Sequence, residues 1–166
     1  MERIENWDEY FFRLAYVVAQ KSHDPKTRIG SILVRDKNVI STGYNSFPRL
    51  VNDSAERYNN RDLKRKIVCH SEENTILTSA RLGINTSNTT LFTFGFPCCN
   101  CMKILIQGGV SDLVTHKQWP NLIHSPEWIE SIELSRILAN EAGINIRIFD
   151  KVLGTQGLLD GKVINV

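Results

Sequence analysis

Four polar residues in two short segments limit the folds open to this chain. His70 and Glu72 form the first segment, and Cys98 and Cys101 lie in the second, Pro97-Cys98-Cys99-Asn100-Cys101. An imidazole and two thiolates are typical zinc ligands, and three protein ligands leave the fourth tetrahedral position open, as in catalytic zinc sites. The fold must therefore bring both segments to one point, with the Glu72 carboxylate beside the ion as a proton carrier.

Each ligand segment is predicted to open a helix directly after an extended stretch. One helix is expected from His70 to Arg81, ended by Gly83, and another from Pro97 to Gly108. Free N–H groups in a first helical turn favour anions by about 0.3–1 kcal/mol. They help to keep Cys98 and Cys101 as thiolates, the form that binds metal. The sequence thus predicts one catalytic Zn²⁺ per chain.

Helical and extended patterns alternate through the rest of the chain. The expected elements are a helix from Asn6 to before Pro25, a hairpin of 29–34 with 39–42, strands 89–94 and 113–115, a helix from Pro126 to Gly143 and a strand 144–148. Residues 48–66 are expected to be a long loop, or a loop with a short helix. The pattern predicts a three-layer α/β/α sandwich around a mixed, mostly five-stranded sheet, as one domain over residues 1–150. The Gly-rich residues 151–166 are expected to be a C-terminal tail in the form of a loose arm.

Composition argues against several partners. The net charge of +2 is too small for a surface that binds nucleic-acid phosphates. No apolar run approaches the roughly 20 residues that span a bilayer, and the N-terminus lacks the apolar core of a signal peptide. Three of the four Cys fall within four positions, which suits metal binding and a reducing cytoplasm better than a disulfide framework. We therefore expect a cytoplasmic protein without membrane or nucleic-acid partners.

Longer stretches around these motifs resemble the deoxycytidylate (dCMP) deaminases of the cytidine deaminase-like superfamily. The pattern H-x-E followed by P-C-x-x-C is the known signature of zinc deaminases. The resemblance runs from about residue 7 to residue 149 and rests on segments 22–30, 43–48, 68–76 and 96–110. It implies hydrolysis of dCMP to dUMP and ammonia, with Glu72 carrying the protons, in a homo-oligomer that is a hexamer or another even assembly.

The resemblance also implies further site residues. Those expected at the substrate are Asn45 at the sugar 3′-hydroxyl, Arg28 with Ser22 or Lys26 near the 5′-phosphate, Asn74 fixing the site and Trp119 stacking on the base. Those expected in regulation by dCTP and dTTP are Tyr44, Ser46 and Arg81. Two of these have simpler interpretations, because Arg28 could be a solvated charge at a strand start and Arg81 a cation favouring its helix C-terminus.

Departures from the family pattern keep other functions open. Ser71 replaces the usual Ala between the ligand His and the Glu, a small-for-small change. Ser46 replaces the usual Gly in the regulatory loop, and Trp119 stands where many relatives carry Tyr. The alternatives are deamination of another nucleotide, nucleoside or base such as dCTP, cytidine or guanine, editing of single-stranded nucleic acid, and a non-catalytic module stabilised by zinc.

Overall fold

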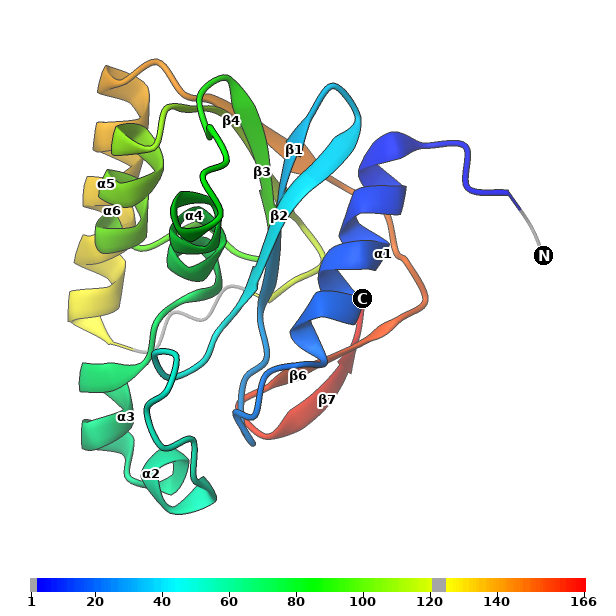
Figure 1. Cartoon of the computed structure of the whole chain (residues 1–166). Helices are drawn as coiled ribbons and strands as arrows, with labels where there is room; N and C mark the ends of the chain where they lie inside the picture. Colours follow the sequence, from blue (N-terminus) through cyan, green and yellow to red (C-terminus); the bar gives the residue numbers. More distant parts are fainter. Residues whose placement is uncertain (1–2, 121–124) are drawn as a thin grey trace.

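The computed structural model describes residues 3–120 and 125–166 and contains a mixed five-stranded sheet in the order β2-β1-β3-β4-β5 (Figure 1). The elements are α1 (Trp7–Ala19), β1 (Gly30–Arg35), β2 (Asn38–Tyr44), α2 (Ala55–Asn59), α3 (Arg61–Ile67), α4 (Ser71–Arg81), β3 (Thr89–Thr93), α5 (Cys99–Gln107), β4 (Val110–His116), α6 (Pro126–Glu141), β5 (Asn145–Phe149), β6 (Gln156–Leu159) and β7 (Lys162–Asn165). Strand β1 is antiparallel to β2 and β3, whereas β3, β4 and β5 are parallel. The predicted mixed α/β fold is confirmed.

Helices cover both faces of this sheet, which makes the three predicted layers. Figure 1 shows α1 on one side and α4, α5 and α6 on the other. Because successive side chains of a strand point to opposite faces, Ile32 packs in the core beneath α1 while its neighbour Leu33 packs in the core beneath α4 and α5. None of the helices in the described part of the chain combines the length and the apolar composition that crossing a membrane requires.

The segment 48–66, expected to be a long loop or a loop with one short helix, contains α2 and most of α3. Ser54 caps α2 by accepting a hydrogen bond from the Arg57 N–H, and Asn60 caps α3 by accepting one from the Leu63 N–H. Side-chain acceptors of this kind satisfy N–H groups that have no partner within a helix. Polar residues that suggested a loop therefore serve as helix caps here.

The expectation of a loose arm after Asp150 is wrong. Strands β6 and β7 form an antiparallel hairpin, and Leu153, Leu159 and Val166 are buried in the same core as α1. The Val166 carbonyl also accepts a hydrogen bond from the Leu153 N–H. Three well-spaced apolar side chains are enough to dock the tail, although they are too few to give a periodic pattern in the sequence.

Candidate zinc centre and substrate cavity

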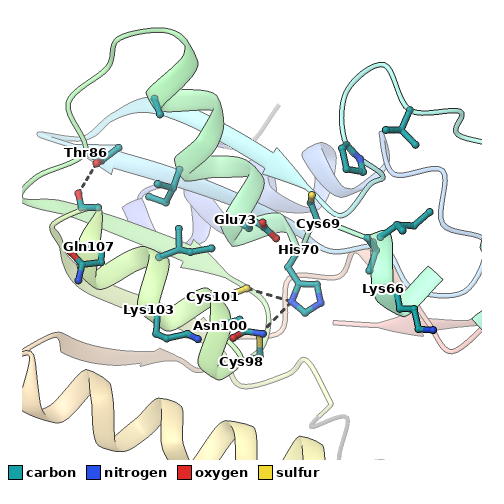
Figure 2. Close-up of a pocket in the computed structure, with 18 of the residues that line it drawn as sticks. Lys66, Cys69, His70, Glu73, Thr86, Cys98, Asn100, Cys101, Lys103 and Gln107 are labelled. Atoms are coloured by element: carbon teal, nitrogen blue, oxygen red, sulfur yellow. Dashed lines mark hydrogen bonds between the residues drawn. The ribbon is translucent and has the colours of Figure 1, made fainter. Parts of the chain in front are cut away.

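Two helix N-termini bring the predicted metal ligands together. His70 is the N-cap of α4, Cys98 is the N-cap of α5, and Cys101 lies in the first turn of α5. The His70 Nδ1 atom lies 3.5 Å from Cys98 Sγ and 3.4 Å from Cys101 Sγ. Figure 2 shows the imidazole directed at both sulfurs.

These distances fit a zinc ion. Zn–N bonds of about 2.0–2.1 Å and Zn–S bonds of about 2.3 Å at a tetrahedral angle place nitrogen and sulfur about 3.6 Å apart. The three ligand atoms lie within 4.8 Å of one another, and all three residues are largely shielded from solvent. The donor set and its spacing therefore suit one Zn²⁺ with an open fourth position.

The charge distribution also favours a cation at this point. The hydrogen bond with Cys101 lowers the pKa of Cys98 to about 4, and the hydrogen bond with Cys98 raises the pKa of His70 to about 9. The same contact with Cys98 raises the pKa of Cys101. A divalent cation bound here would take the place of the protons on these groups, because thiol ligands of a metal lose theirs outright.

Glu72 lies beside the three zinc-ligand residues and is buried, with 7% of its surface exposed. Burial raises the pKa of its carboxyl group, so this group binds a proton more readily than an exposed carboxyl group does. The Ser71 hydroxyl donates to Glu72 Oε2 over 2.9 Å and is itself 2.7 Å from the Ser31 hydroxyl, which donates to Thr93. Ser71, read from the sequence as a small replacement for Ala, thus joins Glu72 to a buried chain of hydroxyl groups on the sheet.

Two cavities meet at His70 and Cys98. The larger is an open groove of about 1220 Å³ between α4 and α5, which includes Cys101 (Figure 2). The smaller has a volume of about 480 Å³ and is lined by Glu72, which does not line the groove. Because the proton carrier faces the smaller space, we regard this space as the candidate substrate cavity.

The walls of this substrate cavity combine apolar side chains, several of them aromatic, with charged ones. Its apolar side chains are Ile29, Val68, Phe96, Trp119, Pro120, Trp128, Ile129 and Ile132, and its charged ones besides Glu72 are Asp24, Lys64, Arg65, Glu133 and Arg136. Lys64 forms an ion pair with Asp24, whose side chain is almost completely buried. The Arg136 guanidinium lies 4.1 Å from the centre of the Phe96 ring.

The sequence did not single out these cations as site residues. Lys64 and Arg65 belong to a stretch of mixed charge that looks like a solvated helix face, and Arg136 is a single cation between Ser135 and Ile137 in α6. The available signal was the density of Lys and Arg at residues 57–66. Only the packing of α3 and α6 around one space brings them near the metal ligands.

Asn45 and Trp119 are among the residues that line the substrate cavity, whereas Ser22, Lys26, Arg28 and Asn74 are not. The Asn45 amide group donates to the Thr27 carbonyl over 2.8 Å, and its oxygen accepts from the Ile29 N–H over 2.8 Å. Its side chain thus holds the segment before β1 in place. Binding of a sugar hydroxyl by Asn45 stays a prediction.

Three of the other predicted residues form hydrogen bonds to nearby backbone carbonyls. Ser22 donates to the Asn45 carbonyl, and Arg28 Nε donates to the Asp24 carbonyl. Asn74 donates to the Tyr44 carbonyl over 2.8 Å and to the Ser46 hydroxyl over 3.1 Å. The remaining two, Lys26 and Arg81, are exposed. The roles of all these residues in substrate binding or regulation stay predictions.

Comparison with known proteins places this geometry in a family. The family described as "Cytidine and deoxycytidylate deaminase zinc-binding region" matches residues 5–117. The chain belongs to this family. With the His70, Cys98 and Cys101 group, membership makes the protein a zinc-dependent aminohydrolase with one zinc site.

Several curated proteins are similar over most of the chain. A deaminase of Aliivibrio fischeri without an assigned substrate is 31% identical over 86% of this chain and 93% of its own length. The deoxycytidylate deaminase of Homo sapiens is 30% identical over 86% of this chain and 79% of its own. That of Saccharomyces cerevisiae is 34% identical over 87% of this chain, which spans only 45% of the yeast protein.

Solved structures show the same fold. The dCMP deaminase of the cyanophage S-TIM5 has a TM-score of 0.64 at 18% identity, covering 89% of this chain and 100% of the phage chain. At this level of identity the similarity concerns the fold alone, and it agrees with the cytidine deaminase-like architecture predicted from the sequence.

Proposed function

We propose that this protein hydrolyses dCMP to dUMP and ammonia. The observation that carries the proposal is the position of Glu72, a buried carboxyl group that faces the substrate cavity next to the ligand group. Relatives named deoxycytidylate deaminase, similar over more than four fifths of this chain, support the choice of dCMP.

The reaction needs a nucleophile and a proton carrier. Zn²⁺, when bound by His70, Cys98 and Cys101, supplies an activated water for attack at C4 of the cytosine ring. Glu72 accepts the two protons of the attacking water in turn, passing the first to ring N3 and the second to the amino group, which leaves as ammonia. Its raised pKa suits this shuttle, because the carboxyl group must both gain and lose a proton. The hydrogen bond from Ser71 fixes the orientation of the carboxylate.

The walls of the cavity support a nucleotide rather than a free base. Trp119 and Phe96 line the space, so the pyrimidine ring would lie beside aromatic side chains. Arg65 and Arg136 line the same space, and an Arg side chain can pair with two phosphate oxygens. Lys64 already balances Asp24, so the two arginines are the cations left for a 5′-phosphate.

The proposal also covers the cellular compartment, the assembly and the regulation of the protein. We propose a cytoplasmic homo-oligomer, supported by the four reduced cysteines and by exposed apolar side chains such as Val17 and Ile148. Regulation by dCTP and dTTP would act through the loop of Tyr44 and Ser46. Asn74 joins this loop to α4, the helix that carries Glu72, which gives an effector a route to the proton carrier.

The test is ammonia release by the zinc-loaded protein from dCMP, dCTP, deoxycytidine, cytidine, CMP and guanine, each with and without added dCTP or dTTP. We expect dCMP to give the highest kcat/KM. Arg65→Ala and Arg136→Ala should raise KM for dCMP more than KM for deoxycytidine. If another compound is turned over and dCMP is not, the assignment of dCMP as substrate is wrong. The result would favour a deaminase of another nucleotide, nucleoside or base, the alternative that Trp119 suggests.

A matched variant tests the proton carrier. Glu72→Gln keeps the shape of the side chain and removes its acid–base function, so we expect kcat to fall by roughly 10²–10⁴-fold. Bound zinc should stay at the wild-type level. Undiminished turnover would show that another group carries the protons.

A further inference from the structure

The C-terminal hairpin lies behind the substrate cavity. The Arg28 N–H donates to the Leu158 carbonyl over 3.0 Å, and the Gly161 N–H donates to the Lys26 carbonyl over 2.7 Å. The segment held in this way continues into Thr27 and Ile29, which line the cavity. Figure 1 shows β6 and β7 beside the stretch that leads into β1. The hairpin therefore supports one wall of the cavity from outside.

The same hairpin touches the indole ring of Trp119, which is 4% exposed and lines the cavity. A Cβ atom placed on Gly157 would lie 2.7 Å from Cζ3 and 3.5 Å from Cη2 of this ring. Phe94 and Tyr16 pack on the ring with centroid distances of 4.7 Å and 6.3 Å. The indole is thus held between the hairpin and the core, at a contact that only a glycine permits.

Hydrogen bonds of His116 also connect the backbone of Trp119 with Lys151, at the start of the tail. The Trp119 N–H donates to the His116 carbonyl over 3.2 Å, and His116 Nε2 is 2.8 Å from the Lys151 carbonyl. The ring of Trp119 is therefore in contact with Gly157, and its main chain is linked to Lys151 through His116.

We propose that Gly157 is a positioning residue for the substrate cavity, and that the C-terminal hairpin sets the place of the Trp119 indole within it. This role rests on the proposed function, because it requires that the base of the substrate enters the cavity lined by Trp119. Carbon atoms in contact lie about 3.5–4.0 Å apart, so a methyl group at residue 157 displaces the ring by about 1 Å. A displacement of this size in an active site can lower kcat/KM by up to about 100-fold.

The experiment is Gly157→Ala in the full-length, zinc-loaded protein. Gly157 does not have the positive φ at which alanine would strain the backbone. We expect KM to rise about tenfold, kcat to fall by a smaller factor, and bound zinc to stay unchanged. In a ¹H–¹⁵N spectrum the Trp119 indole signal, assigned by its loss in Trp119→Phe, should shift while those of Trp7 and Trp128 stay in place. Val163→Ala, at a side chain 65% exposed on β7, is the matched control and should change neither readout.

A double variant separates positioning from general loosening of the hairpin. Phenylalanine lacks the outer ring atoms that the new methyl group meets, so in the Trp119→Phe background Gly157→Ala should change KM less than twofold. An unmoved Trp119 signal, an unchanged KM, or the same factor in both backgrounds would overturn the proposal. The factor is measured on whichever compound of the panel the wild-type protein deaminates, so a wrong substrate assignment is distinguished from a wrong role for Gly157.

Discussion

His116 offers a quantitative test of the buried network behind the cavity. Its ring is 2% exposed, with Nδ1 2.9 Å from the Tyr16 hydroxyl and Nε2 2.8 Å from the Lys151 carbonyl. A neutral ring satisfies both partners, because Nε2–H donates to the carbonyl and Nδ1 accepts from the hydroxyl. Burial lowers the pKa of His116, in agreement with a neutral ring in the folded protein.

His116→Phe keeps an aromatic ring but leaves the Tyr16 hydroxyl buried without its partner. An unsatisfied buried polar group costs about 1–3 kcal/mol. Lys151 is exposed, so water can replace the bond to its carbonyl, and we assign the loss to Tyr16. Each kcal/mol lowers the Tm of a protein of this size by roughly 2–4 °C. Together these ranges give an expected fall of about 2–12 °C at pH 8, measured by thermal unfolding.

The pH dependence supplies a second readout. Because the folded pKa of His116 is lowered, the unfolded chain binds its proton more readily, so this residue's contribution to stability is present above about pH 6.5 and is lost as the pH falls below that value. The Tm difference between wild type and His116→Phe should therefore shrink between pH 8 and pH 5.5. In a Tyr16→Phe background the substitution should cost much less. An equal loss in both backgrounds, or a difference independent of pH, would refute this account.

Three further substitutions test other parts of the site. Cys101→Ala removes one of three ligands, so zinc measured by atomic absorption after dialysis should fall far below one ion per chain; full retention would contradict the ligand set. Lys64→Met leaves the buried Asp24 carboxylate without its cation and should lower the free energy of unfolding in urea by about 3–5 kcal/mol. Most of that loss should return in the Lys64→Met/Asp24→Asn double variant, and no return would show that the pair is not coupled. Ser71→Ala removes the hydrogen bond to Glu72, so kcat should fall about tenfold or less with zinc retained, and a larger fall would give Ser71 a more direct role.

The metal ligands could be predicted from the sequence because their placement is a local property. His70 and Cys98 each stand where an extended segment ends and a helix begins, and the three-residue spacing of Cys98 and Cys101 places both sulfurs on one helical turn. The five strands of the central sheet could also be predicted, since they are short runs rich in β-branched residues, whereas β6 and β7 were not. Neither inference needed knowledge of distant contacts.

The cavity could not be predicted in the same way. Arg65 and Arg136 meet only because α3 and α6 pack around the same space, which no local pattern records. Arg28 and Asn74, expected at the substrate, instead donate hydrogen bonds to the backbone carbonyls of Asp24 and Tyr44. The tail was missed because Leu159 and Val166 become buried through contacts with residues far away in the chain.

The metal ligands and the residues that line the cavity are distributed differently along the chain. Strand β3 is the single strand between α4 and α5, so the metal ligands all come from one contiguous α-β-α unit. The cavity instead draws on residues from Asp24 to Arg136, with the hairpin behind it. Contacts between residues close in sequence lose less chain entropy on closure than distant ones, so the metal-binding unit can form early in folding. Mutations near either terminus can then reshape the cavity and change which substrate fits, while the chemistry at the metal is inherited intact.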